Sequence, residues 1–236
     1  QMADAADVMA SITRTTGISY SALTPNLTGY DRAMASRVDE IAVFAACSET
    51  FSQKNINCSI AESLTRFAPV LGAAERDNVP VRGYVSCVVG CPYEGEVEPN
   101  TVVLVVEKLL EMGCYEVSLG DTIGAGTPKS VGDLLSVVLN NLPAHSLAGH
   151  FHDTSGRALD NIRVSLEKGM RVFDSAVAGM GGCPYAPGAK GNVSTGAVVH
   201  MMDQLGMNSG IDLDKLAQAE AFATNLRSPY QNGDHT

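Results

Sequence analysis

Extended and helical patterns alternate along this chain, and the alternation constrains its fold more than any other feature of the sequence. Each extended segment is rich in β-branched or apolar residues and is followed by a helical pattern. Parallel strands joined by helices have this rhythm, because each crossover must return the chain to the start of the next strand. The sequence therefore predicts an α/β fold with a parallel sheet whose strands cover residues 19–24, 40–46, 81–87, 115–120, 146–152 and 172–177.

Several helical segments carry signals at their ends. Ser59 and Glu62 form a capping box, S-x-x-E, at the start of a helix in which Pro69 is expected to introduce a kink. Thr127 followed by Pro128 is typical of an N-cap and the first helical residue. These signals support helices between the predicted strands.

The two faces of the predicted strands favour a closed barrel over an open doubly wound sheet. Arg82, Tyr84 and Ser86 share one face of their strand, and Glu116 and Ser118 share one face of the next. An open parallel sheet covered by helices on both sides should be apolar on both faces, whereas a barrel interior can carry polar groups toward an active site. We therefore expect a (β/α)8 TIM barrel.

A TIM barrel needs eight strands and about 250 residues. Six strands are predicted here, so we expect the first two strands to be missing on the N-terminal side, with extra helices near the C-terminus. Residues 1–227 should form a single catalytic domain that is incomplete at its N-terminus, and residues 228–236 should form a tail.

Composition narrows the class of protein. The 236 residues and 45% apolar content suffice for one domain with a full core. No apolar run reaches the roughly 18 residues of a membrane span, and no signal-peptide pattern is visible. A net charge of −10 disfavours nucleic acid or an anionic membrane as a partner. Six cysteines without the spacing of a disulfide scaffold indicate a reducing compartment, a bacterial cytoplasm or a mitochondrial matrix.

His150 and His152 stand two residues apart at the end of an extended segment. A strand sends such residues to the same face about 6.5 to 7 Å apart, so both imidazoles could bind one metal ion. The alternative is a histidine pair that only ends a strand. Two imidazoles with oxygen donors suit Mg²⁺, Mn²⁺, Co²⁺, Zn²⁺ or Fe²⁺, and the Asn192 amide could supply an oxygen.

The glycine-rich stretch 178–192 carries Cys183 and could be a mobile lid with an acid/base thiol. The alternative is a surface loop with an incidental cysteine. Gly-Cys-Pro-Tyr occurs twice, at 90–93 and at 182–185, and the second copy lies in the more glycine-rich stretch.

Three further features are weaker signals. Asp121, at a strand end, could act as a base or as a partner of an imidazole, or it could cap a turn. Lys54 could meet an anionic substrate or be a solvated surface lysine. The Gly-Ala-Gly segment at 124–126 could hold a phosphate through its N–H groups, although a bare G-x-G is weak evidence.

Taken together, these stretches resemble the hydroxymethylglutaryl-CoA lyase family, (β/α)8-barrel enzymes of the DRE-TIM metallolyase superfamily. The resemblance runs from about residue 1 to residue 226. It is most specific in KNINCS at 54–59, RGYVSCVVGCPYEG at 82–95, GCYEVSLGDTIGAGTP at 113–128, HFHDTSG at 150–156 and AGMGGCPYAPGAKGN at 178–192. The H-x-H pair is shared across the superfamily, whereas the cysteine-bearing loop points to the lyase.

The resemblance implies cleavage of 3-hydroxy-3-methylglutaryl-CoA to acetyl-CoA and acetoacetate, a step of leucine degradation and ketone-body formation. It implies that His150, His152 and Asn192 bind a divalent cation, Mg²⁺ or Mn²⁺. It also implies that Cys183 is a catalytic acid/base and that Asp121 is a polar site residue.

Lys54 and Asn55 fall where the family approaches the CoA part of its acyl-CoA substrate. The family's first strand ends in an Arg-Asp-Gly motif and its second strand contributes a Glu, and neither is found here. Two alternatives therefore stay open: a condensing enzyme for an acyl-CoA and a 2-oxo acid, of the isopropylmalate or homocitrate synthase type, or a catalytically inactive metal-binding homologue. Exposed barrel helices often support dimers, so a homodimer is also an expectation.

Overall fold

The computed structural model describes residues 4–182 and 191–231. Its main sheet has six parallel strands, and each of the six predicted segments overlaps one of them. In their order across the sheet they are β1 (Ser21–Leu23), β2 (Glu40–Ala46), β3 (Val81–Ser86), β6 (Glu116–Asp121), β7 (Leu147–Phe151) and β8 (Val172–Asp174).

Helices connect the strands of the sheet, and the described residues also contain one helix before the first strand and two after the last. They are α1 (Ala5–Ser11), α2 (Leu27–Ala35), α3 (Glu49–Ile56), α4 (Ile60–Asp77), α5 (Pro99–Glu111), α6 (Pro128–Asn141), α7 (Ala158–Glu167), α8 (Thr195–Gln204) and α9 (Leu213–Gln231), with short 3₁₀ turns at Ala144–Ser146 and Val177–Gly179. A small antiparallel hairpin of β4 (Gly90–Cys91) and β5 (Gly95–Glu96) follows β3. The sequence signals had not predicted α3 or this hairpin.

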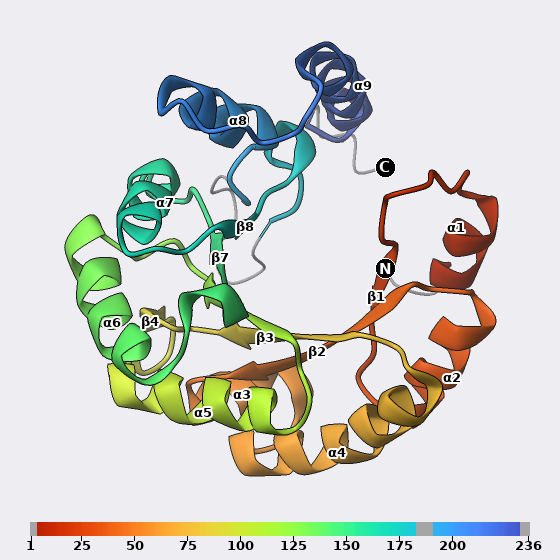
Figure 1. Ribbon diagram of the computed structural model, residues 1–236, viewed down its shortest axis with the longest axis vertical. Helices are drawn as coiled ribbons and strands as arrows, with labels where there is room; N and C mark the ends of the chain where they lie inside the picture. The colour runs from red at the N-terminus through yellow and green to blue at the C-terminus, as the bar shows by residue number, and fades with distance from the viewer. Residues whose placement is uncertain (1–3, 183–190, 232–236) are drawn as a thin grey trace.

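Neighbouring strands in the sheet are also neighbours in the chain, apart from the inserted hairpin. A doubly wound sheet reverses its strand order at a switch point, whereas a barrel keeps adding strands in one direction. Figure 1 shows the sheet curled into an arc, with α2 and α4 to α7 along its outer side and β1 and β8 at its two ends. The prediction of a TIM-barrel fold is confirmed, and the described residues form a curled part of that barrel.

The hydrophobic core lies between the sheet and the outer helices. The strand side chains that point outward, toward the helices, are fully buried, and they include Ile41, Val117 and Leu147. They form one cluster with Leu109 of α5 and Ile162 of α7. Burying one such aliphatic side chain contributes roughly 1.5–3 kcal/mol. This packing holds the strands firmly, so the residues at their ends keep fixed positions.

The inner face of the arc is polar, as the alternation of the strands predicts. Arg82 pairs with Glu116 across β3 and β6, and His150 pairs with Asp174 across β7 and β8. Because side chains at paired positions project to the same face of a sheet, these four polar groups lie on the inner side of the arc.

Helix α4 carries two of the sequence signals. The capping box of Ser59 and Glu62 is present, with both reciprocal hydrogen bonds made. Helix α4 runs as one helix across Pro69, which the structure leaves exposed. Pro69 has no N–H to donate to the carbonyl of Thr65, but Thr65 is also exposed, so water can bond that carbonyl and the helix can continue.

Helices α8 and α9 follow the last strand of the sheet, and they confirm the expected additional C-terminal helices. The carboxylate of Glu220 on α9 accepts a hydrogen bond of 3.0 Å from the backbone N–H of Gly196 in the first turn of α8. Helix α9 continues to Gln231, past the expected domain boundary at 227. Among the described residues, no helix combines the length and apolar character required to cross a membrane.

Candidate active site

A cavity of about 490 Å³ lies inside the arc, toward the carboxyl ends of the strands. This is the end at which TIM-barrel enzymes carry their active sites. The residues that matter for its chemistry come from four strands and from α3, and they are Phe44, Asn55, Tyr84, Ser118, His150 and His152.

The two histidines lie on the same side of the chain, as their spacing predicts. The ring centroids of His150 and His152 are 5.3 Å apart, and the rings are inclined by 46°. Phe151 between them is buried in the core on the other side of the strand. The alternation of β7 therefore delivers two imidazoles to one cavity.

Asn192 reaches this pair through backbone pairing. Residue 192 forms an antiparallel bridge with His152, and the N–H of Asp153 donates to the carbonyl of Gly191 at 2.9 Å. The Asn192 Nδ2 donates to the carbonyl of Met180 at 3.0 Å, so its side-chain oxygen is the atom that can serve as a ligand. The structure thus places the backbone of Asn192 directly beside His152, one residue of the histidine pair.

The two ends of the cysteine-bearing loop meet beside Asn192. A Cβ atom added to Gly191 would lie 1.6 Å from the carbonyl oxygen of Gly181, so only glycine allows this close approach. Cys183 itself lies outside the described residues. The described ends nevertheless show that the loop starts and finishes next to the histidine pair.

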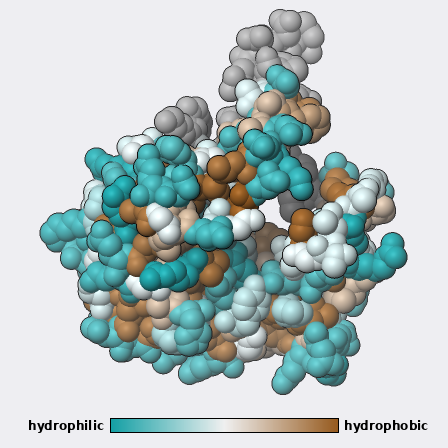
Figure 2. All heavy atoms as spheres, turned by 45° about the horizontal axis from the view of Figure 1, so that its top comes forward, coloured by the Kyte–Doolittle hydropathy of each residue, from teal (hydrophilic) through white to brown (hydrophobic). Residues whose placement is uncertain are grey.

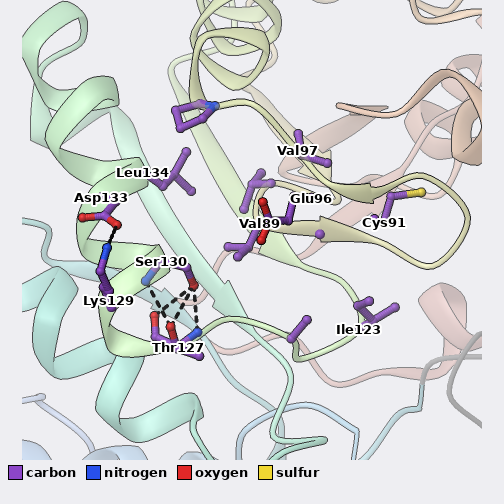
Figure 3. A pocket seen from close by; sticks show the side chains of 15 residues that line it. Val89, Cys91, Glu96, Val97, Ile123, Thr127, Lys129, Ser130, Asp133 and Leu134 are labelled. Carbon is purple, nitrogen blue, oxygen red and sulfur yellow. Dashed lines mark hydrogen bonds and ion pairs between the residues drawn. The ribbon is translucent and has the colours of Figure 1, made fainter.

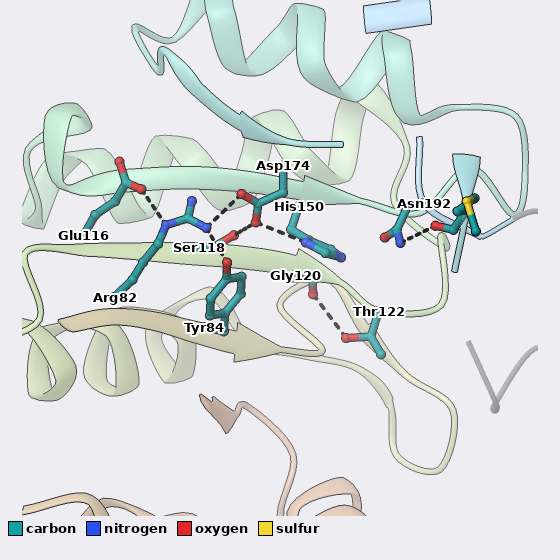
Figure 4. Close-up of polar contacts among 10 residues, drawn as sticks. Arg82, Tyr84, Glu116, Ser118, Gly120, Thr122, His150, Asp174 and Asn192 are labelled. Atoms are coloured by element: carbon teal, nitrogen blue, oxygen red, sulfur yellow. Dashed lines mark hydrogen bonds and ion pairs between the residues drawn. The ribbon is translucent and has the colours of Figure 1, made fainter. Parts of the chain in front are cut away.

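The imidazole of His150 contacts the carboxylate of Asp174, a residue that the sequence signals had not identified. Its Nδ1 lies 3.1 Å from Oδ2 of Asp174, and Ser118 Oγ donates to the same oxygen at 2.7 Å (Figure 4). Arg82 donates to the other Asp174 oxygen at 2.8 Å and to Glu116 at 2.8 Å. A buried ionic cluster therefore supports one of the two histidines.

The cluster controls the charge of Asp174. Burial alone would raise the pKa of the Asp174 carboxyl, but the hydrogen bonds from His150 and Ser118 and the charge of Arg82 hold this pKa below its ordinary value. The carboxyl group is therefore ionised at neutral pH and can only accept hydrogen bonds.

His152 has a different environment. Its Nδ1 is buried, and within the described residues it has no hydrogen-bond partner. Burial, with a smaller contribution from the charge of His150, lowers the pKa of His152 to about 4. The imidazole is therefore neutral at neutral pH, which is the form that binds metal ions.

These donors fit a divalent cation: an orphaned buried nitrogen, a second imidazole that is already oriented, and an amide oxygen. Residues 4–182 and 191–231 contain no group of three or more His, Cys, Asp or Glu side chains arranged to hold a metal. The described donor set therefore lacks a carboxylate ligand.

Asp121 lies beside the cavity and does not line it. The side chain is fully buried and accepts hydrogen bonds from the N–H groups of Gly126 at 2.9 Å and Ala125 at 3.0 Å. Burial raises the pKa of Asp121, and these loop amides offset part of the rise. Because Asp121 occupies two of the amide groups of the Gly-Ala-Gly segment, those groups are not available to a phosphate.

The two residues predicted to approach CoA diverge on α3. Asn55 lines the cavity. The Lys54 ammonium lies 4.9 Å from the centre of the Tyr93 ring, next to the hairpin. Only one of the pair therefore contributes to the wall of the cavity.

The first Gly-Cys-Pro-Tyr copy has a structural environment. Cys91 is buried near Phe51, and its sulfur lies 3.0 Å from Ser48 Oγ. It also lines a separate cavity of about 630 Å³ between the hairpin and the start of α6, where Lys129 pairs with Asp133 on the rim (Figure 3). Neither histidine of the pair lines that cavity.

The fold and the site together define a class: a barrel enzyme with a candidate metal centre at the carboxyl ends of its strands. The chain belongs to the HMGL-like family, which it matches over residues 1–223. Membership of this family implies dependence on a divalent metal ion. The relatives named below are carbon–carbon lyases.

A cytoplasmic 3-hydroxy-3-methylglutaryl-CoA lyase of Danio rerio is 54% identical over 94% of this chain and 66% of its own length. A mitochondrial hydroxymethylglutaryl-CoA lyase of Gallus gallus is 52% identical over 95% of this chain and 76% of its own length. The crystal structure of the lyase from Brucella melitensis superposes with a TM-score of 0.94 at 60% identity, covering 96% of this chain and 80% of that one. The chain thus spans about two thirds to four fifths of these relatives.

Proposed function

We propose that this chain cleaves 3-hydroxy-3-methylglutaryl-CoA to acetyl-CoA and acetoacetate in a reaction that depends on a divalent cation. The observation that supports the proposal is that His150 and His152 line one strand-end cavity, with the backbone of Asn192 paired to His152. The names of the relatives support the substrate and the reaction. The condensing and inactive alternatives have no observation in their favour.

The cation would be held by the two imidazoles and the Asn192 amide oxygen. Mn²⁺ accepts nitrogen and oxygen ligands, and Mg²⁺ prefers oxygen, so we propose Mn²⁺ or Mg²⁺. When bound, such an ion acts as a Lewis acid toward the oxygens of the substrate.

The side chains of the protein would carry out the proton transfers of the reaction. The substrate's C3 hydroxyl loses its proton, the C2–C3 bond breaks as C3 becomes the carbonyl of acetoacetate, and the electron pair of that bond moves to C2. One proton delivered to C2 completes acetyl-CoA. We assign this delivery to the thiol of Cys183, because the described ends of its loop meet beside Asn192.

The remaining walls of the cavity would orient the acyl-CoA. Asn55 lines the cavity on the side of α3, and we propose that it contacts the CoA portion. Lys54 would attract the CoA phosphates from the rim beside Tyr93. Asp121 would hold the loop from Gly124 to Gly126 in place. This loop packs against the backbone of His152, because a Cβ added to Gly124 would lie 2.8 Å from the carbonyl oxygen of His152.

The test is an assay of the chain with 3-hydroxy-3-methylglutaryl-CoA and either Mn²⁺ or Mg²⁺, in which acetyl-CoA and acetoacetate are quantified chromatographically. We expect equal amounts of both products, and no product after chelation of the metal. A parallel incubation with acetyl-CoA and a 2-oxo acid should release no CoA. A protein that binds the cation and forms neither product would support the inactive homologue instead.

Two further parts of the proposal concern partners and compartment. We infer a homodimer, which light scattering coupled to size-exclusion chromatography would measure directly. The names of the relatives mention the cytoplasm and the mitochondrion, and for this chain we propose a bacterial cytoplasm or a mitochondrial matrix.

A further inference from the structure

A buried ionic cluster lies next to the histidine pair, and His150 is the only member of it that the proposed chemistry uses. We define the Arg82 cluster as Arg82, Glu116, Ser118, His150 and Asp174 (Figure 4). The Arg82 and Glu116 side chains are only 10% and 9% exposed. Its contacts join four strands of the sheet, β3, β6, β7 and β8.

The contacts of the cluster converge on one carboxylate. Asp174 Oδ1 accepts a hydrogen bond of 2.8 Å from Arg82. Asp174 Oδ2 accepts one of 2.7 Å from Ser118 and lies 3.1 Å from His150 Nδ1. Arg82 reaches Glu116 with its Nε and Asp174 with a terminal nitrogen, so its guanidinium bridges β6 and β8. Rotation of the Asp174 carboxylate would break several of these contacts together.

This geometry fixes the proton of His150. A carboxylate beside a guanidinium accepts hydrogen bonds and donates none, and the Ser118 hydroxyl already donates to the oxygen that faces the imidazole. His150 Nδ1 must therefore carry the proton. In the neutral imidazole, Nε2 then presents a lone pair, as a metal ligand requires.

Stability alone does not account for the cluster. Apolar residues of similar volume usually stabilise a barrel interior as well as a buried ion pair does, because desolvation offsets the attraction between the charges. Nor does the cluster support both histidines, because His152 Nδ1 has no partner among the described residues. Its contacts lead to one imidazole only.

We propose that Asp174 is a positioning residue that orients His150 and fixes its Nδ1–H tautomer for a divalent cation, and that Arg82 and Ser118 hold Asp174 in place. The proposal rests on the proposed metal site. It assigns the two histidines different roles, one oriented in advance and the other free to adjust when the ion binds.

The decisive variant is Asp174→Asn, which keeps the shape of the side chain. The guanidinium of Arg82 should attract the amide oxygen and repel the amide nitrogen, which turns the NH₂ group toward His150. His150 Nδ1 would then have to accept, and its proton would move to Nε2, the wrong tautomer for a ligand, as a comparable Asp→Asn change does in serine proteases. The matched control is Glu116→Gln, the same chemical change at the other end of Arg82, without contact to His150.

Two measurements on folded protein, verified by circular dichroism, test the proposal. Histidine ¹⁵N NMR of the metal-free protein at about pH 8 reports the tautomer, and calorimetric titration with Mn²⁺ reports affinity. We expect Nδ1–H for His150 in the wild type, Nε2–H in Asp174→Asn, and Mn²⁺ affinity lower by about 10–100-fold in that variant. Glu116→Gln should leave both readouts unchanged.

Three results would overturn the inference. The first is an Nε2–H tautomer of His150 in the wild type, a result that does not require any variant to fold. The others are an unchanged Mn²⁺ affinity in Asp174→Asn and an equal loss of affinity in Glu116→Gln. A wild-type protein that binds no Mn²⁺ rejects the proposed metal site instead. The exchange of tautomer between wild type and Asp174→Asn then still decides whether Asp174 orients His150.

Discussion

Two histidines of identical chemistry acquire different properties from their surroundings. His150 contacts the Asp174 carboxylate, whereas His152 has a buried Nδ1 without a partner among the described residues. Burial lowers the pKa of His152 to about 4, so its imidazole is neutral at neutral pH. One imidazole is therefore oriented by a carboxylate, whereas the other is kept neutral by burial.

The loop cysteine gives a prediction at the residue scale. Cys183→Ala should reduce kcat by about 100-fold or more, because a positioned acid contributes roughly 10²–10⁴-fold. Metal content, measured by plasma mass spectrometry, should equal that of the wild type. Cys91→Ala is the control from the other Gly-Cys-Pro-Tyr copy, and it should alter stability more than kcat, because Cys91 is buried. Wild-type turnover in Cys183→Ala would remove this residue from the mechanism.

Gly126 gives a second prediction at this scale. A Cβ there would lie 2.7 Å from Oδ2 of Asp121 and 3.1 Å from Nδ2 of Asn161. Gly126→Ala should therefore lower the free energy of unfolding by about 1–3 kcal/mol, as overpacking does elsewhere. Urea denaturation measures the change. Gly132→Ala is the control: it lies inside α6, its Cβ would meet nothing closer than Val164 at 3.5 Å, and it should be neutral or stabilising.

At the scale of single elements, helix α4 contains a proline that its fold tolerates. Pro69 lies on the exposed side of α4 and removes one backbone hydrogen bond. Pro69→Ala should restore that bond and raise the free energy of unfolding by about 1–3 kcal/mol. Part of this gain is offset, because the unfolded chain is more flexible without the proline. Pro99→Ala is the contrast, because Pro99 begins α5, where proline is favourable. Equal changes in both variants, measured by urea denaturation, would contradict this reasoning.

Elements differed in how well local signals predicted them. The strands, α4 and α6 were expected from periodicity and from the caps at Ser59 and Thr127, because neighbours in sequence make those interactions. Helix α3 was not, since its sequence is largely polar and its stability depends on the Ser48 cap and the burial of Phe51. The hairpin of β4 and β5 has only two residues in each strand, too few for a periodic pattern to be recognised.

At the scale of the whole molecule, the arc of strands brings residues far apart in sequence to one cavity. Figure 2 shows the molecule as a mixed polar and apolar surface around a hollowed centre. A ligand that bridges β7 and the segment of Asn192 should therefore stabilise the entire fold, because it binds only when both are in place.

Metal binding gives the prediction at this scale. Mn²⁺ at 100 times its dissociation constant should add about 2.7 kcal/mol to the free energy of unfolding. For a chain of this size that corresponds to a rise of roughly 5–10 °C in Tm. Differential scanning calorimetry with Mn²⁺ and with a chelator measures the shift. The variant His150→Ala/His152→Ala should show none, and a shift of equal size in that variant would place the ion elsewhere.

The sequence by itself determined the order of the strands, the starts of α4 and α6, and the shared face of the two histidines. These features depend on residues close together in the chain, where periodicity and capping act. Only the tertiary structure decided that Asp174 supports His150, that Arg82 reaches across 92 positions to Asp174, and that Asp121 holds a loop. Those contacts depend on strand register and on the curvature of the sheet, which arise from packing across the whole barrel wall and leave no local pattern in the sequence.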